Sequence, residues 1–374
     1  MKERYYRAGQ LTKRVIAAIA VLAIASVTMA AYGSSASLAA SRKPHGRSAS
    51  RAPSAATVKF QVYQGNLVNL VTYVATEEGF FKKNGIKAQL VPIGSSVVGA
   101  AALTAGSIDV LSASPDGILP LVAKGLTAKV IAGQTKQIFE LIINKKYKVS
   151  GKYPRDLAVL KGKTVGVTAL GAASQAQVEA MLKQAGIPVT DVTFVPVGAA
   201  ASAVAAFTQG KVDALSYYAP TTTVPVLNKR AVVLANPAKP GDGPPGIAGA
   251  DYVAEWVTGS YLASHKSTVA RIRKAMAEAS VWMHQAANLS KVTKVVKGIV
   301  GAAVPSSDLA KFTKQNLATY DTAAYSKTSL RFWDQFDTKY KFISSEVPLS
   351  QIYAPGTPAN LAAERSMARG KLKH

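Results

Sequence analysis

Small polar residues recur in this sequence where a strand-like pattern ends and a helix-like pattern begins. Their hydroxyl and amide groups, with the free backbone N–H groups and the dipole of a helix start, suit an anion or a small polar solute. The same residue types also cap helices and form turns, so each one alone has a structural interpretation. The candidate ligand residues are Gln64, Gly65 and Asn66; Ser95 and Ser96; Ser112, Ser114 and Asp116; and Thr168, Gly171, Ala172 and Ser174.

Two tyrosines extend this set. Tyr217 and Tyr218 follow a strand-like segment at the position that corresponds to residues 113–116 in an earlier copy of the same pattern. Their rings are able to stack on a solute, and their hydroxyl groups are able to hydrogen-bond it.

Groups that carry covalent or metal chemistry are scarce. The 374 residues include no cysteine, which excludes disulfides, cysteine–zinc sites, iron–sulfur clusters and a cysteine nucleophile. The histidines are His45, His265, His284 and His374, and none stands at metal-ligand spacing with carboxylates. Gly162-Lys163-Thr164 ends like a phosphate-binding loop, but Leu157 stands where that motif needs glycine. We expect no catalytic group, no metal site and no cofactor.

An internal repeat predicts two similar domains. Residues 90–112 and 194–216 align at a constant offset of 104, with ten identities in 23 positions. Each copy follows a helical stretch that ends in Gly-Ile, at Gly85 and Gly186, and glycine commonly ends helices. Asp109 and Asp213 occupy equivalent positions, which favours a structural role for both.

Each copy has the pattern strand, helix, strand, helix, strand. The expected segments are 58–63, 67–83, 86–91, 97–105 and 108–112, and then 164–168, 174–185, 192–195, 199–209 and 212–216. This alternation predicts an α/β fold with two lobes, each a mostly parallel sheet flanked by helices. Ligands of such sheets bind beyond the carboxyl ends of the strands, so the candidate loops should meet in the cleft between the lobes.

The expected domain ranges follow from these elements. They are a signal peptide (1–40), a flexible linker (41–57), the first part of lobe 1 (58–155), lobe 2 (156–255), a helical return to lobe 1 (256–345) and a C-terminal extension (346–374). The chain should cross between the lobes near 145–160 and 250–262. Trp282, Phe332, Trp333 and Phe336 should pack the returning helices onto lobe 1.

The N-terminus predicts export to the periplasm. Five basic residues between Lys2 and Arg14 precede the apolar stretch 15–31, and small residues follow it, as in a secretory signal peptide. Cleavage is expected after Ala30 or Ala39, and an uncleaved membrane anchor is the alternative. Residues 1–57 carry nine basic residues and one acid, so +8 of the net charge of +25 lies in the leader and linker.

Three segments resemble one family. Residues 73–86, which include Glu78-Gly79-Phe80, resemble the first-helix pattern of nitrate/sulfonate/taurine-type solute-binding proteins of ABC transporters. Residues 102–109 and 162–167 are similar to two further patterns of that family. The resemblance covers about residues 58–340. It implies a two-lobed periplasmic-binding-protein (Venus-flytrap) fold that closes around one small solute and delivers it to a membrane permease. Because one chain supplies both walls of the cleft, we expect a monomer.

The resemblance also implies that the solute contacts lie in the candidate loops and at Tyr217 and Tyr218. A sulfonate or nitrate would bind helix N-termini and hydroxyl groups, and the basic composition favours such an anion. A taurine-like solute would need an acceptor for its ammonium group, for which Asp116 and Asp251 are candidates. A pyrimidine-like solute would stack on the tyrosines. Ala172 and Ala173 stand where many members have Gly and Ser, which leaves fewer hydroxyl groups.

Other classes fit the sequence less well. An enzyme on the same fold that acts on a pyrimidine-like compound would rely on cysteine or histidine chemistry that is scarce here. A regulator would need a DNA-binding or signalling segment, which residues 1–57 do not resemble. Beyond residue 57 there are 36 basic and 19 acidic residues, but they are scattered. A nucleic-acid binder would need a concentrated basic stripe with interleaved aromatic residues, so we expect no nucleic-acid partner.

Overall fold

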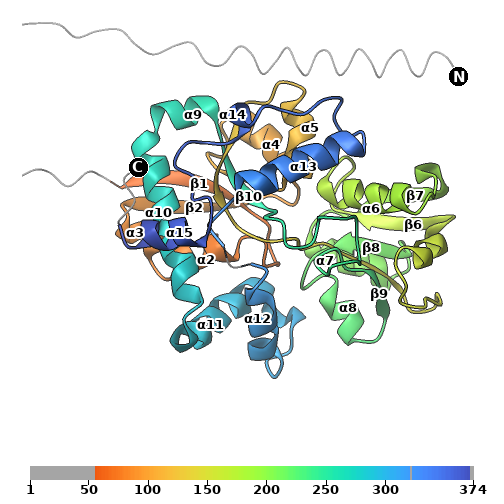
Figure 1. The fold of residues 1–374 in the computed structure, drawn as a ribbon. Coiled ribbons are helices and arrows are strands. Elements are labelled where there is room, and N and C mark those ends of the chain that lie inside the picture. Colours follow the sequence, from red (N-terminus) through yellow and green to blue (C-terminus); the bar gives the residue numbers. More distant parts are fainter. Residues whose placement is uncertain (1–54, 321, 371–374) are drawn as a thin grey trace, which may run out of the picture. The chain divides into compact units, whose positions relative to one another are not determined.

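The computed structural model describes residues 55–320 and 322–370 (Figure 1). The predicted signal peptide and all but the end of the predicted linker lie outside the described residues. The last linker residues, Ala56 and Thr57, already belong to the first strand.

The first lobe contains two small sheets that meet edge to edge. β1 (Ala56–Val62) pairs in parallel with β2 (Ile86–Pro92), and β10 (Ala254–Thr258) lies between β3 (Leu111–Ala113) and β4 (Ala128–Gly133). A parallel bridge between Phe60 and Val110 joins β1 to the start of β3. The resulting order is β2-β1-β3-β10-β4.

The second lobe is built on one five-stranded sheet with the order β7-β6-β8-β5-β9. The strands are β5 (Glu140–Asn144), β6 (Lys163–Val167), β7 (Val192–Pro196), β8 (Ala214–Tyr217) and β9 (Ala231–Ala235). This order matches that of lobe 1 strand for strand. The repeat therefore produces two lobes of the same topology, which confirms the predicted α/β fold.

One strand in each lobe runs against the others. β5 pairs antiparallel with β8 and β9, and β10 pairs antiparallel with β3 and β4. Both strands enter their sheet directly after the chain has crossed from the other lobe. The remaining pairs, β1 with β2 and β6 with β7 and β8, are parallel.

The crossings differ from the expected positions. The first runs through residues 134–139, between β4 and β5, and the second through residues 236–253, between β9 and β10. β5 thus belongs to lobe 2, although the sequence placed residues up to 155 in lobe 1. A bridge between Lys136 and Asp251 holds the two crossing segments together, and we call these segments the hinge strands.

Helices flank both sheets. Lobe 1 has α2 (Leu70–Glu77), α3 (Phe80–Lys83), α4 (Ser96–Thr104) and α5 (Pro115–Val122). Lobe 2 has α6 (Ala173–Gln184), α7 (Ala200–Thr208) and α8 (Thr223–Leu227), with short 3₁₀ turns at Arg155–Leu160 and Val189–Asp191. The helix predicted over 67–83 is divided at Gly79, whose φ is 76°, because such a conformation cannot continue an α-helix.

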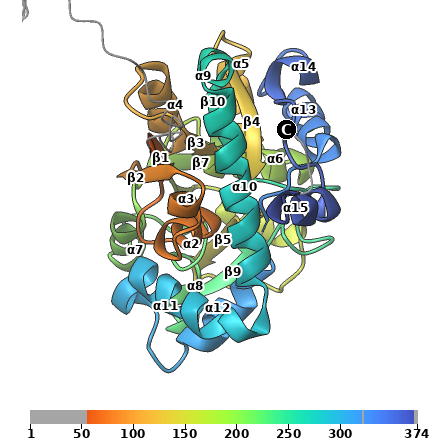
Figure 2. The same cartoon turned by 90° about the vertical axis from the view of Figure 1, so that its left-hand side faces the viewer.

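After β10 the chain is helical and returns to lobe 1. The helices are α9 (Gly259–Ser264), α10 (Lys266–Met283), α11 (Leu289–Val300), α12 (Leu309–Leu317), α13 (Lys327–Lys339), α14 (Leu349–Ile352) and α15 (Leu361–Ala368), with 3₁₀ turns at Ala286–Asn288 and Gly301–Ala303. Figure 2 shows α10 running beside α2, α3 and α15. As predicted, Trp282 packs on Phe80 of lobe 1. Trp333 and Phe336 pack on each other within α13, which lies against α5.

The segment predicted as a C-terminal extension is an integral part of lobe 1. α15 packs along α10, and Tyr353 forms a bridge to Val130 of β4. Ile352 and Met367 are buried. Packing of these apolar side chains explains why residues 346–370 form a defined part of the lobe.

Asp109 and Asp213 have the structural role that their equivalence predicted. Oδ2 of Asp109 accepts the backbone N–H of Lys59 in β1 at 2.8 Å, and Oδ2 of Asp213 accepts that of Thr164 in β6 at 3.0 Å. Each carboxylate thereby joins the start of the third strand of its lobe to the first strand.

Candidate functional site

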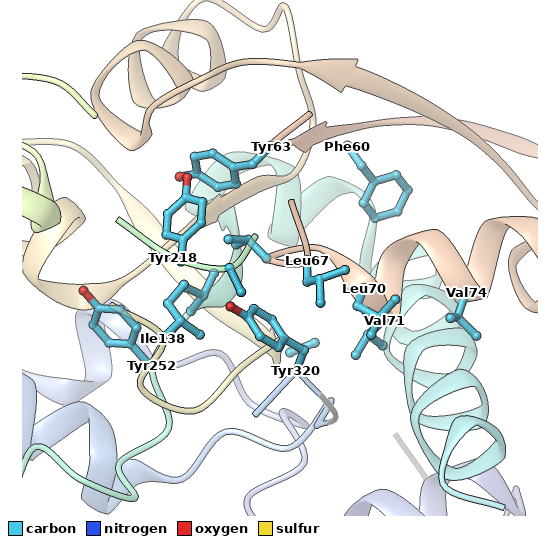
Figure 3. Packing of buried hydrophobic residues seen from close by; sticks show 14 of the residues in the cluster. Phe60, Tyr63, Leu67, Leu70, Val71, Val74, Ile138, Tyr218, Tyr252 and Tyr320 are labelled. Atoms are coloured by element: carbon cyan, nitrogen blue, oxygen red, sulfur yellow. The ribbon is translucent and has the colours of Figure 1, made fainter. Parts of the chain in front are cut away.

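A small cavity lies between the two lobes, at the carboxyl ends of their strands. Its volume is about 20 Å³, and its lining comes from lobe 1, from both hinge strands and from lobe 2. Figure 3 shows part of this region, with Tyr63 of lobe 1 beside Tyr218 of lobe 2 and Ile138 of the first hinge strand nearby. The lining residues are Tyr63, Val68, Ser96, Ser114, Ile138, Phe139, Thr168, Ala173, Tyr218 and Val253.

The wall from lobe 1 carries hydroxyl groups at two helix starts. Ser96 is the first residue of α4, and Ser114 immediately precedes α5. Their Oγ atoms converge on Gly117 of α5, where an added Cβ would lie 2.8 Å from Ser96 Oγ and 3.4 Å from Ser114 Oγ. The same Cβ would lie 3.5 Å from Ala173 of lobe 2, so the lobes touch at this point.

The wall from lobe 2 is formed by the start of α6 and by the end of β8. Thr168 donates its backbone N–H to Ser174 Oγ at 3.0 Å, and the two hydroxyl groups lie 2.9 Å apart. This pair fixes the loop between β6 and α6, with Thr168 facing the cavity. Ala173 completes the wall, and together with α4 and α5 the start of α6 directs a third helix N-terminus to this region.

Aromatic rings enclose the cavity. The ring centroid of Tyr218 lies 6.1 Å from that of Tyr63 and 5.4 Å from that of Phe139. Phe139 in turn lies 5.9 Å from Tyr252 of the second hinge strand. Burial raises the pKa of Tyr63 and of Tyr218 well above the usual range for tyrosine, so both phenols are neutral. The walls therefore combine neutral hydroxyl groups with ring faces and edges.

One of these hydroxyl groups has no hydrogen-bond partner within the described structure. Among the residues that the structure describes, Tyr218 OH is buried without a hydrogen bond, whereas Tyr63 OH donates to the Ser112 carbonyl at 3.0 Å. An unpaired buried hydroxyl costs free energy. No charged side chain of residues 55–320 and 322–370 belongs to the cavity lining. The site is thus equipped with hydroxyl groups and helix starts and not with a buried cation.

A second cavity of about 110 Å³ continues the lobe boundary on one side. Gln64, Asn66 and Tyr217 line it, and the Cβ that Gly65 lacks would lie 3.8 Å from Ala200 at the start of α7. Tyr217 OH donates to the Gly198 carbonyl at 2.7 Å, so the hydroxyl group is used within lobe 2.

Four predicted site residues serve the local structure. Ser95 caps α4 by accepting the backbone N–H of Val98 at 3.3 Å. Ser112 lies in β3, and its backbone N–H donates to Gln61 Oε1 at 3.1 Å. Ala172 caps α6 without a side-chain hydrogen bond, and the Gly171 backbone N–H donates to Gln175 at 2.9 Å. Gly171 lines a further cavity of about 350 Å³ between α5 and α6.

The two predicted ammonium acceptors lie in different surroundings. Asp116 is buried at the lobe boundary and accepts hydrogen bonds from Tyr252 and Gln177. Asp251 lies in the second hinge strand, where it pairs with Lys136 and accepts from the Ser326 backbone and the Ser329 hydroxyl. Asp251 borders another pocket, beside α10 and α15, and lines none of the lobe-boundary cavities described above.

Sequence reasoning missed Tyr63, Phe139 and Tyr252. Tyr63 directly follows β1, one residue before the predicted loop, so the carboxyl-end rule applied one residue earlier would have found it. Phe139 and Tyr252 lie in the hinge strands, which have no counterpart in the repeat. No sequence signal marked these two residues.

Within the described residues there is no group of three or more His, Asp or Glu side chains that is able to hold a metal ion. In the same part of the chain, no helix has both the length and the apolar character needed to cross a bilayer.

Solved structures share this fold. The alkanesulfonate-binding protein SsuA from Xanthomonas axonopodis pv. citri, bound to MOPS, has a TM-score of 0.65 at 16% identity, over 80% of this chain and 98% of that one. The periplasmic nitrate-binding protein NrtA from Synechocystis PCC 6803 has a TM-score of 0.68 at 15% identity, over 86% and 90%. The desulfurization enzyme DSZB has a TM-score of 0.52 at 15% identity, over 83% and 98%. The predicted periplasmic-binding-protein fold is thereby confirmed.

A search of curated proteins finds no match. The profile of the family described as NMT1/THI5 like matches residues 66–287, from the loop after β1 to the 3₁₀ turn after α10. This range includes the aligned repeat residues 90–112 and 194–216, both hinge strands and every residue that lines the cavity between the lobes except Tyr63. The chain belongs to the NMT1/THI5-like family.

Proposed function

We propose that this chain is the extracytoplasmic solute-binding component of an ABC importer, and that it holds one small solute between its lobes by hinge closure. The observation that carries the proposal is the division of one cavity lining among lobe 1, lobe 2 and both hinge strands. A solute that contacts both walls binds the closed arrangement better than an open one, and therefore shifts the equilibrium towards closure.

The chemistry of the walls favours an anionic solute of modest charge, such as a sulfonate or nitrate. Three helix starts and the hydroxyl groups of Ser96, Ser114 and Thr168 supply hydrogen-bond donors. Tyr218 OH has no hydrogen-bond partner among the described residues and is a further donor. Because no lysine or arginine in the described part of the chain lines the cavity, a dianion would be poorly compensated. The rings of Tyr63, Phe139 and Tyr218 suit an apolar body attached to the anionic group.

The first test is a thermal-shift screen of the purified protein against nitrate, bicarbonate, alkanesulfonates, taurine, aryl carboxylates and pyrimidines. A solute that binds only the folded chain stabilises it by about 2.7 kcal/mol at a concentration of one hundred times Kd. We expect a shift with at least one monoanion, and calorimetry then gives the Kd and a stoichiometry of one. A shift with pyrimidines alone would contradict the anionic class, and a silent screen would count against the solute-binding role.

The alternative is an enzyme on the same fold that acts on a pyrimidine-like compound, since the fold is shared with a desulfurization enzyme. We expect the solute found in the screen to be recovered unchanged after prolonged incubation with the protein, as measured by mass spectrometry. A product that accumulates in proportion to protein concentration would establish the enzyme.

The importer role also requires export. We expect the full chain, expressed with its leader, to appear in the periplasmic fraction, with a new N-terminus after Ala30 or Ala39. Mass spectrometry of the fractionated protein measures both. Retention in the membrane fraction with an intact leader would support the uncleaved anchor instead.

A further inference from the structure

A buried hydrogen-bond cluster ties the two lobes to the second hinge strand. Tyr252 OH donates to the Asp116 carboxylate of α5, with oxygen separations of 2.9 Å. Gln177 belongs to α6 in lobe 2. Its Nε2 donates hydrogen bonds to Asp116 Oδ2 at 3.2 Å and to Tyr252 OH at 2.6 Å. Asp116 is 1% exposed, and Gln177 and Tyr252 are fully buried. Closure of α6 onto α5 therefore completes the burial of the Asp116 carboxylate.

A second carboxyl group lies near the first. Asp337 belongs to α13, which packs against α5, and its side chain is fully buried. Neither of its carboxyl oxygens has a hydrogen-bond partner among the described residues. Burial, and then the neighbouring charges of Asp116 and Asp334, raise the pKa of Asp337 well above the usual range of a carboxyl group. Two buried carboxylates that repel each other are costly when both are ionised.

The charged groups around this pair do not neutralise it. Lys124 after α5, Glu179 of α6 and Lys341 after α13 line the adjoining cavity together with Asp116. Asp334 adds a further negative charge from α13, and Tyr325 is a neutral buried phenol. Within the described part of the chain, no cation forms an ion pair with Asp116 or Asp337. A proton is the remaining means of compensation.

We propose that closure of the lobes takes up a proton at the pair formed by Asp116 and Asp337, so that the open–closed equilibrium and the solute affinity depend on pH. This inference rests on the hinge closure proposed above. It assigns Asp116 a positioning role, because its carboxyl group acts on lobe closure and not on the solute.

The direction of the effect follows from the two environments of Asp116. Burial raises the pKa of Asp116 to about 6 in the closed arrangement. When α6 and Gln177 move away, water reaches the carboxyl group and its pKa falls towards the ordinary value of about 3.9. Protonation therefore favours the closed form, and the effect grows as the pH falls below 6. The ratio of closed to open molecules should therefore rise between pH 7 and pH 5.

The test measures lobe closure directly and without solute. The chain has no cysteine, so spin labels can be attached at introduced cysteines alone. We choose the exposed positions Ser107→Cys in lobe 1 and Gln209→Cys in lobe 2. Pulsed electron paramagnetic resonance then gives the distribution of inter-lobe distances from pH 8 to pH 5. We expect the shorter distance to gain population as the pH falls, and we expect Asp116→Asn to abolish this dependence.

Three further variants test whether the pH dependence comes from Asp116 and Asp337 and not from other acidic residues. Asp337→Asn should weaken or abolish the dependence in the same way as Asp116→Asn. Glu255→Gln should retain it, although burial raises the pKa of Glu255 to about 7, because Glu255 bonds to Thr72 and Gln134 within lobe 1 and its hinge strand. Asp308→Asn, at an exposed position, should leave the pH profile unchanged. Circular dichroism verifies that each variant is folded.

The two proposals fail in distinguishable ways. Inter-lobe distances that are the same from pH 8 to pH 5, or a pH dependence that survives in both Asp116→Asn and Asp337→Asn, would overturn the proton-linked closure. If the solute found in the screen still shortened the distance under those conditions, the solute-binding function would stand. If no solute moved the lobes at any pH, the proposed function would fail first.

Discussion

Two adjacent tyrosines differ in what their hydroxyl groups contact. Tyr217 OH donates to the Gly198 carbonyl at 2.7 Å, whereas Tyr218 OH is buried without a partner in the described residues. Their rings lie 4.6 Å apart, between centroids. The Tyr217 hydroxyl therefore stabilises the fold, whereas the Tyr218 hydroxyl is available to a solute.

Removal of each hydroxyl should have opposite consequences. Tyr218→Phe should leave the free energy of unfolding unchanged or slightly raise it, since no hydrogen bond is lost, and should weaken solute binding by roughly tenfold. Tyr217→Phe should lower the free energy of unfolding by about 1 kcal/mol, with little effect on affinity. Urea denaturation without solute and calorimetry with solute measure the two quantities. Equal loss of stability in both variants would refute this assignment.

Asp213 should contribute to stability in a pH-dependent way. Partial burial opposes ionisation, but hydrogen bonds from Tyr147 OH and from the Thr164 backbone and hydroxyl outweigh it and hold the pKa of Asp213 below its usual value. A lowered pKa stabilises the fold above about pH 4, and the contribution disappears as the pH falls through the folded-state pKa.

Asp213→Asn should therefore cost roughly 1 kcal/mol at pH 7. The cost should shrink as the pH falls below about 4 and through the folded-state pKa, because the wild-type carboxylate is then protonated as well. Urea denaturation of both proteins over this pH range measures the difference. A difference that stayed constant down to pH 3 would contradict the role of the charge. Asp308→Asn, at an exposed position, serves as the matched control.

At the scale of elements, β4 and the segment before α13 approach each other closely. A Cβ added to Gly133, the last residue of β4, would lie 2.1 Å from the Ala324 carbonyl oxygen. The Gly133 backbone N–H also donates to the Ala323 carbonyl at 2.9 Å. Backbone atoms cannot move aside as a flexible side chain does, so this contact admits only glycine.

Gly133→Ala should lower the free energy of unfolding by roughly 2–4 kcal/mol, as expected for steric overlap in a packed interior. Gly298→Ala is the matched control, because Gly298 lies in α11 with nothing within 4 Å of the added Cβ. That variant should gain up to about 1 kcal/mol from helix propensity. Thermal or urea unfolding measures both, and a neutral Gly133→Ala would disprove the close packing.

The helices and strands were predictable because the repeat shows the same pattern of strands and helices twice in the sequence. α4 and α7 lie at the expected ranges to within one or two residues, and Gly85 and Gly186 both adopt φ of 68° after their helices. The hinge strands were misplaced because they are not repeated. Nothing in the strand-like pattern of β5 reveals that it pairs antiparallel in the sheet of the second lobe.

The candidate site was predictable in part for the same reason. The carboxyl-end rule placed Ser96, Ser114, Thr168 and Tyr218 together, and the structure brings all four to one cavity. Asp251 was chosen for its charge alone, and its charge is used by Lys136 within the hinge strands. Which acid faces a cleft depends on long-range pairing, and sequence spacing does not contain that information.

At the scale of the whole described structure, the lobes meet where residues are smallest. Gly65 faces Ala200, Gly94 faces Ala199, and Gly117 faces Ala173, each across the boundary between the lobes. The missing side chains allow two helix-flanked sheets to approach until the cavity between them is nearly closed. Small residues at the boundary thus allow the two lobes to pack closely, with hydroxyl groups and aromatic rings at the centre of the boundary.

Gly117→Val should therefore hold the lobes apart. Its Cβ would lie 2.8 Å from Ser96 Oγ and 3.5 Å from Ala173 Cβ, and the added methyl groups need still more room between α5 and α6. The substitution shifts the equilibrium towards the open form, so fewer molecules are able to bind the solute. The apparent affinity should therefore fall by roughly tenfold or more. Gly298→Val, with open space around the added Cβ, is the control.

Small-angle X-ray scattering with and without the solute found in the screen, together with calorimetry, measures both effects. The wild type and Gly298→Val should become more compact on solute addition, whereas Gly117→Val should remain extended at a solute concentration that saturates the wild type. Wild-type affinity and compaction in Gly117→Val would show that α5 and α6 need not meet for binding, and hinge closure at this contact would be wrong.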